Sequence, residues 1–327
     1  MASIVLGLGT SHTPMLNVQR DEWPNFAESD PTIAVQRDRD GQVGSYDELV
    51  TLAPPALRDY LTADSFQSRY DQAQNGIAKL CATLKVVEPD VVVIIGDDQQ
   101  ELLRHENMPA FQVYWGKEIV SRQPSRRLPW DWYNRANTRN YDRDPQNYPV
   151  ADDLALKIIR TAVAAEFDVA ACSGLAEGSG ENHAIGFVRQ RVMPDRAVPC
   201  VPILINTFFP PNQPLPRRCF AFGQMLRHAI ESWDNPARVA VIASGGLSHF
   251  TIDETLDRDF LEMLRHRDTP AYTALPLAKL NAGTSEIRNW IAAAGALEHL
   301  GMRWSDYVPG YRTAAGTGTG IAFAIWE

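Results

Sequence analysis

Short runs of β-branched and other apolar residues, with little polar alternation, recur along the chain. Such runs are typical of strands in a sheet that is covered on both faces. They predict buried strands at residues 4–8, 91–95, 169–172, 201–205, 239–243 and 321–326.

Between these runs, apolar residues recur at three- and four-residue steps, which is the spacing of one face of an amphipathic helix. One set is Tyr70, Ala73, Ile77, Leu80 and Leu84, and another is Phe222, Met225, Leu226, Ala229, Ile230 and Trp233. Strands that alternate with helices predict a layered α/β fold.

Two stretches show neither periodicity and are predicted to be irregular insertions. Residues 18–46 are polar and contain Pro24 and Pro31, and residues 116–149 are rich in Arg, Asn, Asp and Pro. Long irregular segments are often lids or binding loops, and a solvated surface excursion is the alternative. Trp130, Trp132 and Tyr133 favour a cover over an aromatic substrate for the second stretch.

Composition narrows the class of protein. The 327 residues can bury a large core, and 45% hydrophobic and 22% charged residues are ordinary for a globular protein. A formal net charge of −9 argues against nucleic acid or an anionic membrane as the main partner. The cysteines lack metal-binding spacing, no apolar run could span a bilayer, and no signal-peptide pattern opens the chain. We therefore expect a cytoplasmic enzyme.

Histidines follow strand-like runs at several places. His12 comes after residues 4–8 and a Gly/Ser turn, His249 comes after residues 239–243 and a similar turn, and His183 lies in a glycine-containing segment. Ligand sites in α/β sheets lie past the carboxyl ends of strands, and a neutral imidazole is a natural ligand for a transition metal. One such histidine is usually structural, but three favour a shared site.

A cluster of acidic and amide side chains follows the run at residues 91–95. Asp97, Asp98 and Glu101 could bind or orient a metal ion, and Asp98 could instead cap a helix. In a later segment, Arg288 is most simply interpreted as a solvated partner of a nearby acid.

Taken together, these motifs resemble the class III, LigB-type extradiol ring-cleaving dioxygenases. The resemblance rests on Ser11-His12-Thr13-Pro14, on Gly245-Gly246-Leu247-Ser248-His249 and on Gly283-Thr284-Ser285-Glu286. It implies one catalytic domain over residues 1–327, with a central mixed sheet flanked by helices. It further implies Fe(II) bound by His12 and Glu286, an acid–base role for His249, and His183 as a further active-site histidine. Thr13, Gly316 and Thr317 would contact the substrate.

The chain departs from the family pattern at one metal ligand. Gln99 stands where related enzymes have their second histidine ligand, and the usual facial triad is two histidines and one carboxylate. Either Gln99 or Glu101 could complete the triad. The Asp-Asp-Gln sequence resembles the branch that contains 3-O-methylgallate and hydroxylated dehydrodivanillate dioxygenases.

This branch implies a methoxylated or carboxylated, lignin-derived catechol as the substrate, together with dioxygen. A 2-aminophenol-cleaving dioxygenase and a non-catalytic aromatic-binding member of the family are the alternatives. The insertions could replace the separate α subunit that caps some relatives, and the chain could form a homodimer.

Overall fold

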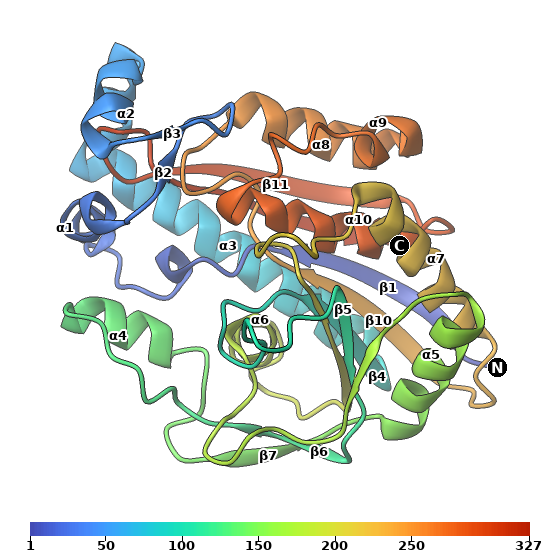
Figure 1. Ribbon diagram of the computed structural model, residues 1–327. Helices are drawn as coiled ribbons and strands as arrows, with labels where there is room; N and C mark the ends of the chain where they lie inside the picture. The colour runs from blue at the N-terminus through green and yellow to red at the C-terminus, as the bar shows by residue number, and fades with distance from the viewer.

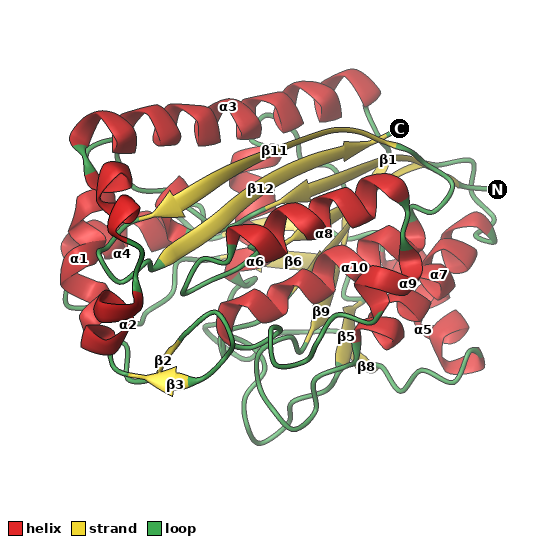
Figure 2. Ribbon diagram, turned by 90° about the horizontal axis from the view of Figure 1, so that it is seen from above, coloured by secondary structure: helices red, strands yellow, loops and turns green.

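The computed structural model describes residues 1–327 and contains a central sheet with the strand order β11-β12-β1-β10-β4-β9-β5-β8 (Figures 1 and 2). Its strands are β1 (Ser3–Thr10), β4 (Val91–Gly96), β5 (Phe111–Tyr114), β8 (Ala170–Cys172), β9 (Cys200–Ile205), β10 (Arg238–Ser244), β11 (Met302–Tyr311) and β12 (Gly318–Trp326). The six predicted strands are confirmed, and β5 and β11 are additional. The predicted α/β class is confirmed as well.

The direction of the strands determines where a site can form. β1, β10, β4 and β9 are mutually parallel, whereas β12 pairs antiparallel with β1 and β11, and β5 pairs antiparallel with β9. The sheet is therefore mixed, as the family resemblance implied. The carboxyl ends of its four central parallel strands lie at one edge, so the segments that begin at Ser11, Asp97, Asn206 and Gly245 leave the sheet together.

Ten α-helices surround the sheet. They are α1 (Phe26–Ser29), α2 (Tyr46–Leu52), α3 (Ala63–Val87), α4 (Asp131–Thr138), α5 (Asp152–Ala164), α6 (His183–Phe187), α7 (Pro216–Glu231), α8 (Glu254–His266), α9 (Thr269–Thr273) and α10 (Ile287–Ala296). The two predicted helices correspond to α3 and α7, although Trp233 lies beyond the end of α7. No helix combines the length and apolar character that a membrane crossing requires.

Alternate residues of the strands supply two hydrophobic cores, one on each face of the sheet. On one face, Val93 and Val241 pack with the apolar sides of α5, α7 and α10. On the other face, Ile94 and Ile242 pack with α3 and α6. Burial on both faces explains why these strands show no polar alternation.

The close packing of α7 on α10 depends on a glycine. A Cβ atom at Gly223 would lie 1.9 Å from the carbonyl oxygen of Ala292, which is too close for any side chain. This contact fixes α10 against α7 on one face of the sheet, and the residue that immediately precedes α10 is Glu286.

Neither insertion is wholly irregular, so that prediction was wrong. Residues 18–46 include α1, the two-residue strands β2 (Gln36–Arg37) and β3 (Val43–Gly44), and 3-10 turns. Residues 116–149 include α4 and the hairpin strands β6 (Glu118–Ser121) and β7 (Gln146–Pro149). These elements are too short to produce a readable period in the sequence.

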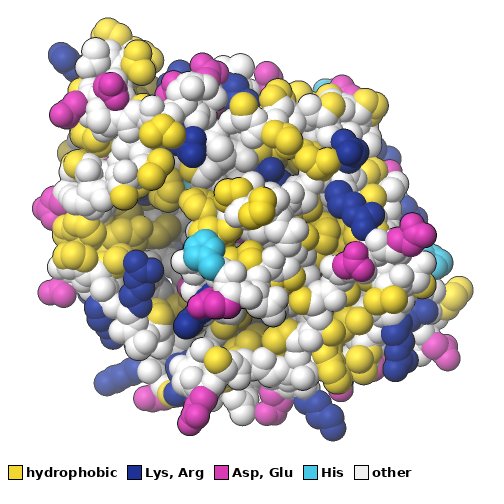
Figure 3. Space-filling model, viewed as in Figure 1, with side chains coloured by type: hydrophobic (Ala, Val, Ile, Leu, Met, Phe, Trp, Pro, Cys, Tyr) yellow, Lys and Arg dark blue, Asp and Glu magenta, His cyan; other side chains and the backbone are white.

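The two insertions pack on one another. The rings of Phe26 and Trp132 have centroids 4.7 Å apart, and Arg135 forms an ion pair with Glu22. In Figure 3, hydrophobic side chains gather around a hollow on the side of the molecule where Figure 1 draws α1 and α4. The insertions therefore contact one another on this side of the protein.

Candidate metal centre

Three of the predicted residues lie together at the carboxyl edge of the sheet, with His12 next to each of the other two. The Nε2 atom of His12 lies 3.2 Å from Nε2 of His183 and 3.3 Å from Oε2 of Glu286. His12 follows β1, His183 is the first residue of α6, and Glu286 immediately precedes α10. His12 and Glu286 are buried, and His183 is partly buried.

A fourth side chain, Asp97, joins this group from the end of β4. Its Oδ1 atom lies 3.8 Å from Nε2 of His12, and the carboxylate is fully buried. His12, Asp97 and His183 offer donor atoms that all lie within 4.8 Å of one another. The sequence had indicated Asp97 only as one of several acids that could bind or orient a metal.

Hydrogen bonds decide which nitrogen each imidazole presents. The hydroxyl of Ser244 donates to the carbonyl of Ala184 at 2.9 Å, so it accepts from Nδ1 of His12 at 3.0 Å. Nδ1 of His183 donates to Glu101 at 2.6 Å. In both rings Nδ1 carries a proton and Nε2 faces the cluster, an arrangement typical of histidines that bind metals.

The two buried carboxylates are held by donors. Oε2 of Glu286 accepts from the backbone N–H of Gly246 at 2.7 Å. The two oxygens of Asp97 accept from the side-chain amides of Asn289 and Gln99, both at 3.1 Å. These bonds fix the direction of each carboxylate before any ligand binds.

The charges in the cluster shift its carboxyl pKa values in opposite directions. Burial and the nearby Glu286 raise the pKa of Asp97 to about 6, although the histidines oppose this shift. Burial also disfavours ionisation of Glu286, but the charges of His249 and His12 hold its pKa well below the usual range. Glu286 is therefore the more readily ionised of the two carboxyl groups.

The donor set fits a first-row transition metal. Neighbouring ligand atoms around an octahedral ion with bonds of about 2.1 Å lie roughly 3 Å apart. The distances of 3.2 Å and 3.3 Å from His12 to its two neighbours match this spacing. Two imidazoles and a carboxylate are also the donor types of the facial triad.

The two sequence candidates for the missing ligand, Gln99 and Glu101, have other partners. The amide nitrogen of Gln99 donates to Asp97, as described above. Glu101 accepts the ring and backbone N–H groups of His183 through one oxygen, at 2.6 and 3.0 Å, and the hydroxyl of Tyr141 through the other, at 3.1 Å. Glu101 is thus arranged to orient His183.

His249 lies beside the cluster, on the far side of Glu286 from His12. Its Nε2 is 3.1 Å from Oε1 of Glu286, and its Nδ1 donates to the carbonyl of Leu247 at 3.0 Å. Burial lowers its pKa, but Glu286 and these hydrogen bonds outweigh the burial, so the pKa of His249 is raised. The ring can hold a proton on the nitrogen that faces the site.

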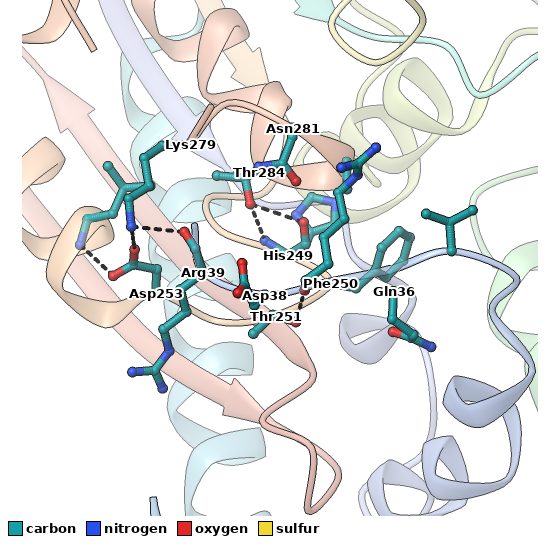
Figure 4. A pocket seen from close by; sticks show the side chains of 14 residues that line it. Gln36, Asp38, Arg39, His249, Phe250, Thr251, Asp253, Lys279, Asn281 and Thr284 are labelled. Atoms are coloured by element: carbon teal, nitrogen blue, oxygen red, sulfur yellow. Dashed lines mark hydrogen bonds and ion pairs between the residues drawn. The ribbon is translucent and has the colours of Figure 1, made fainter. Parts of the chain in front are cut away.

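A polar pocket reaches His249 from the other side (Figure 4). It is lined by residues 35–39 of the first insertion, by the segment that follows His249, and by Lys279, Asn281 and Thr284. The hydroxyl of Thr284 accepts from the backbone N–H of His249 at 3.0 Å. The first insertion therefore lies against the predicted acid–base residue.

Of the predicted substrate contacts, only Thr13 is next to the cluster in the chain. Its hydroxyl accepts from Thr319 at 3.0 Å. Gly316 lies in a turn with a φ angle of +73°, and the buried hydroxyl of Thr317 donates to Asp30 at 2.5 Å. No hydrogen bond joins Gly316 or Thr317 to the histidine cluster.

Sequence reasoning misjudged one side chain of α10 and missed another. Arg288 is buried, with 3% exposure, and donates to backbone carbonyls that include those of Pro214 and Leu280, so its interpretation as a solvated ion-pair partner was wrong. Asn289, which supports Asp97, was not singled out. Its only sequence signal is its position one helical turn after Glu286.

Comparisons with known proteins identify the family of this chain. A family profile described as the catalytic LigB subunit of aromatic ring-opening dioxygenase matches residues 55–322. This range includes Asp97, His183, His249 and Glu286, and it begins after His12.

Curated relatives are similar over parts of the chain. The gallate dioxygenase of Pseudomonas putida is 32% identical over 127 residues, which is 35% of this chain and 35% of the relative. A 2,3-dihydroxyphenylpropionate/2,3-dihydroxicinnamic acid 1,2-dioxygenase of Mycobacterium ulcerans is 25% identical over 239 residues, which is 72% of this chain and 68% of the relative. The protein of the same name from Burkholderia vietnamiensis is 27% identical over 207 residues, which is 47% of this chain and 63% of the relative.

Proposed function

Because this chain belongs to the family of catalytic LigB subunits of aromatic ring-opening dioxygenases, we propose that it is an iron(II)-dependent extradiol dioxygenase. The observation that carries this proposal is that Nε2 of His12 lies 3.2 Å from Nε2 of His183 and 3.3 Å from Oε2 of Glu286, with His249 on the other oxygen of that carboxylate. This pattern supplies both a place for the metal and an adjacent proton carrier.

His12, His183 and Glu286 are the proposed iron ligands, with Asp97 as a neighbouring carboxylate. His183 thereby takes the place of the second histidine, because Glu101 binds its Nδ1 while its Nε2 lies 3.2 Å from Nε2 of His12. Gln99 as a direct ligand stays a prediction, and its bond to Asp97 offers it an indirect role. Ferrous iron, when bound, would activate a catechol and dioxygen for ring opening.

The protein side chains contribute binding and proton transfer. Nε2 of His249 is the atom proposed to accept a proton from a substrate hydroxyl and to return it to the oxygen that leaves during ring opening. Leu247 holds the opposite ring nitrogen, so the imidazole keeps one orientation. The covering insertions at residues 18–46 and 116–149 would limit the access of water within a single catalytic domain of residues 1–327.

The proposed substrate is a carboxylated or methoxylated catechol of the 3-O-methylgallate type, as formed from lignin. The similarity to a gallate dioxygenase supports a carboxylated ring, and the 2,3-dihydroxyphenylpropionate dioxygenases keep a catechol with a longer acidic chain as a second candidate. A 2-aminophenol substrate and a non-catalytic aromatic-binding role are the further alternatives.

The test is anaerobic reconstitution of the protein with Fe(II), followed by oxygen uptake with a substrate panel. The panel contains gallate, 3-O-methylgallate, protocatechuate, 2,3-dihydroxyphenylpropionate, a biphenyl catechol and 2-aminophenol. We expect uptake with at least one carboxylated catechol. Aromatic binding without oxygen uptake would show a binding protein, and uptake with 2-aminophenol alone would favour the aminophenol alternative.

Two substitutions separate the proposed roles. Glu286→Gln should lose iron, whereas His249→Gln should keep iron and lower kcat about 10²- to 10⁴-fold, the usual contribution of a general acid–base group. His266→Gln, at a histidine whose side chain is 74% exposed, is the matched control and should change neither property. Full turnover by His249→Gln would refute the acid–base assignment.

A further inference from the structure

Asp257 is a fully buried carboxylate that the chemistry above does not use. It lies near the start of α8, and its side chain has no accessible surface. One oxygen accepts the backbone N–H of Ser248 at 2.8 Å, and the other accepts the hydroxyls of Ser248 at 2.6 Å and of Tyr307 at 2.8 Å. A buried carboxylate requires such donors, because burial removes its hydration.

The surrounding fold is shaped to admit this carboxylate. A Cβ atom at Gly320 would lie 1.9 Å from Oδ2 of Asp257, so only glycine on β12 leaves room for it. No salt bridge reaches Asp257, and the guanidinium of the next residue, Arg258, lies over the ring of Tyr307 with its Cζ atom 4.6 Å from the ring centroid. The three hydrogen bonds therefore replace the hydration that Asp257 loses on burial, and two of the three come from Ser248.

Those two bonds immobilise the residue that precedes His249. The carbonyl of Ser248 accepts from the N–H of Gly320 at 2.8 Å, so all of its polar groups have partners. His249 is then held by Thr284 at its backbone and by Leu247 and Glu286 at its ring. A shift of Ser248 would therefore move the imidazole ring of His249 relative to Glu286.

We propose that Asp257 is a positioning residue for His249, and that it acts through Ser248 to keep Nε2 of the ring within hydrogen-bond reach of Glu286 and of a bound substrate. The proposal rests on the acid–base role proposed for His249. Asp257 itself touches neither the proposed metal ligands nor His249, so it acts on catalysis only by placing that ring.

The test compares Asp257→Asn, which keeps the shape of the side chain, with Asp259→Asn, an exposed position on the same helix. In iron-loaded protein, Asp257→Asn should lower kcat about 10- to 100-fold, the cost expected for a small misplacement of a catalytic group, while KM and iron content stay unchanged. Asp259→Asn should match the unsubstituted protein in kcat, KM and iron content.

A second measurement does not depend on turnover. In metal-free protein, Asp257→Asn should change the ring NMR shifts of His249 and increase its rate of modification by diethyl pyrocarbonate several-fold. Tyr307→Phe removes one hydrogen bond from Asp257 without touching Ser248, and it should reproduce both effects in weaker form. It also serves as the test if Asp257→Asn does not fold.

The outcomes separate the two proposals. Unchanged kcat together with unchanged reactivity of His249 in the folded variants would overturn the positioning role, as would a loss of kcat that only follows a loss of iron. If the unsubstituted protein consumes no oxygen with any substrate, the proposed function fails, but the reactivity of His249 still shows whether Asp257 positions the ring.

Discussion

In each imidazole of the cluster, a hydrogen-bond acceptor next to Nδ1 fixes the proton on that nitrogen. Ser244 accepts from His12 and Glu101 accepts from His183, so both rings direct Nε2 to the same point. Burial raises the pKa of Glu101, but the charge and hydrogen bonds of His183 outweigh this and lower it, so Glu101 remains an anion. A charged acceptor makes His183 a stronger ligand than a neutral acceptor would.

Glu101→Gln tests this arrangement at a single atom. The amide can still accept from Nδ1 of His183 but carries no charge, so we expect Fe(II) affinity to fall about 10- to 100-fold. Titration of metal-free protein against a competing chelator measures the change. Glu106→Gln, on the exposed loop that follows, is the control, and an equal loss there would contradict the interpretation.

Because the pKa of Asp257 is raised, we expect the free energy of unfolding to depend on pH. Burial raises its pKa to about 7 against the opposing hydrogen bonds of Ser248 and Tyr307, and Asp253, which caps the start of α8, adds to the rise. An unfolded aspartate titrates near pH 4, so between about pH 4 and pH 7 the native protein holds one more proton at this site. Its contribution to the free energy of unfolding therefore decreases as pH rises through this range.

Asp257→Asn removes this titration. Relative to the variant, the unsubstituted protein should have a higher free energy of unfolding at pH 5 than at pH 8. Between about pH 4 and pH 7, this difference should fall by up to about 1.4 kcal/mol per pH unit. Urea unfolding of the two metal-free proteins at four pH values measures it. A difference that is constant or grows with pH would show that the carboxyl does not titrate there.

Among the elements, the first insertion is tied to the end of β11 by a buried ion pair. Nε and Nη2 of Arg312 donate to the two oxygens of Asp30 at 2.8 and 2.9 Å, and both side chains are almost inaccessible. Arg312 also lies over the ring of Phe26, with Cζ 4.2 Å from the centroid. The insertion is thus anchored to the main fold next to the turn that contains Gly316 and Thr317.

Removing one side chain of the Arg312–Asp30 pair should leave the other as an unpaired buried charge. We expect Arg312→Met to lower the free energy of unfolding by about 3–5 kcal/mol, and Asp30→Asn combined with Arg312→Met to recover part of that loss. Thermal unfolding and limited proteolysis within residues 18–46 measure both effects. The exposed pair Arg20–Asp71 is the control, where Arg20→Met should cost less than about 1 kcal/mol.

For the whole molecule, the two insertions are joined by the contacts of Phe26 with Trp132 and of Glu22 with Arg135. We therefore expect this chain alone to turn over its substrate after iron loading, without a separate capping subunit. Oxygen uptake by the purified single polypeptide measures this. Turnover that begins only after a second polypeptide is added would contradict it, and size-exclusion chromatography would report whether a homodimer forms.

Much of the architecture could be predicted from the sequence alone. The buried strands are continuous apolar runs and the long helices keep one apolar face, so their patterns are local and readable. The histidines could be placed as well, because the turns after β1 and β10 deliver His12 and His249 to the same edge of a parallel sheet. β5 and β11 were missed because neither is a continuous apolar run: Gln112 interrupts β5, and Arg303 and Asp306 interrupt β11. The elements of the insertions were missed because they are too short to show a period.

The supporting contacts were decided only by the tertiary structure. Asn289 and Asp97 are 192 residues apart, and Arg312 and Asp30 are 282 residues apart, so no local pattern links either pair. The roles of Glu101 and Asp257 likewise follow from their partners, His183 and Ser248, and not from their own neighbours in the chain. Residue types and strand ends were enough to indicate a metal site, but the orientation of each ligand depends on hydrogen bonds that form only when distant segments pack together.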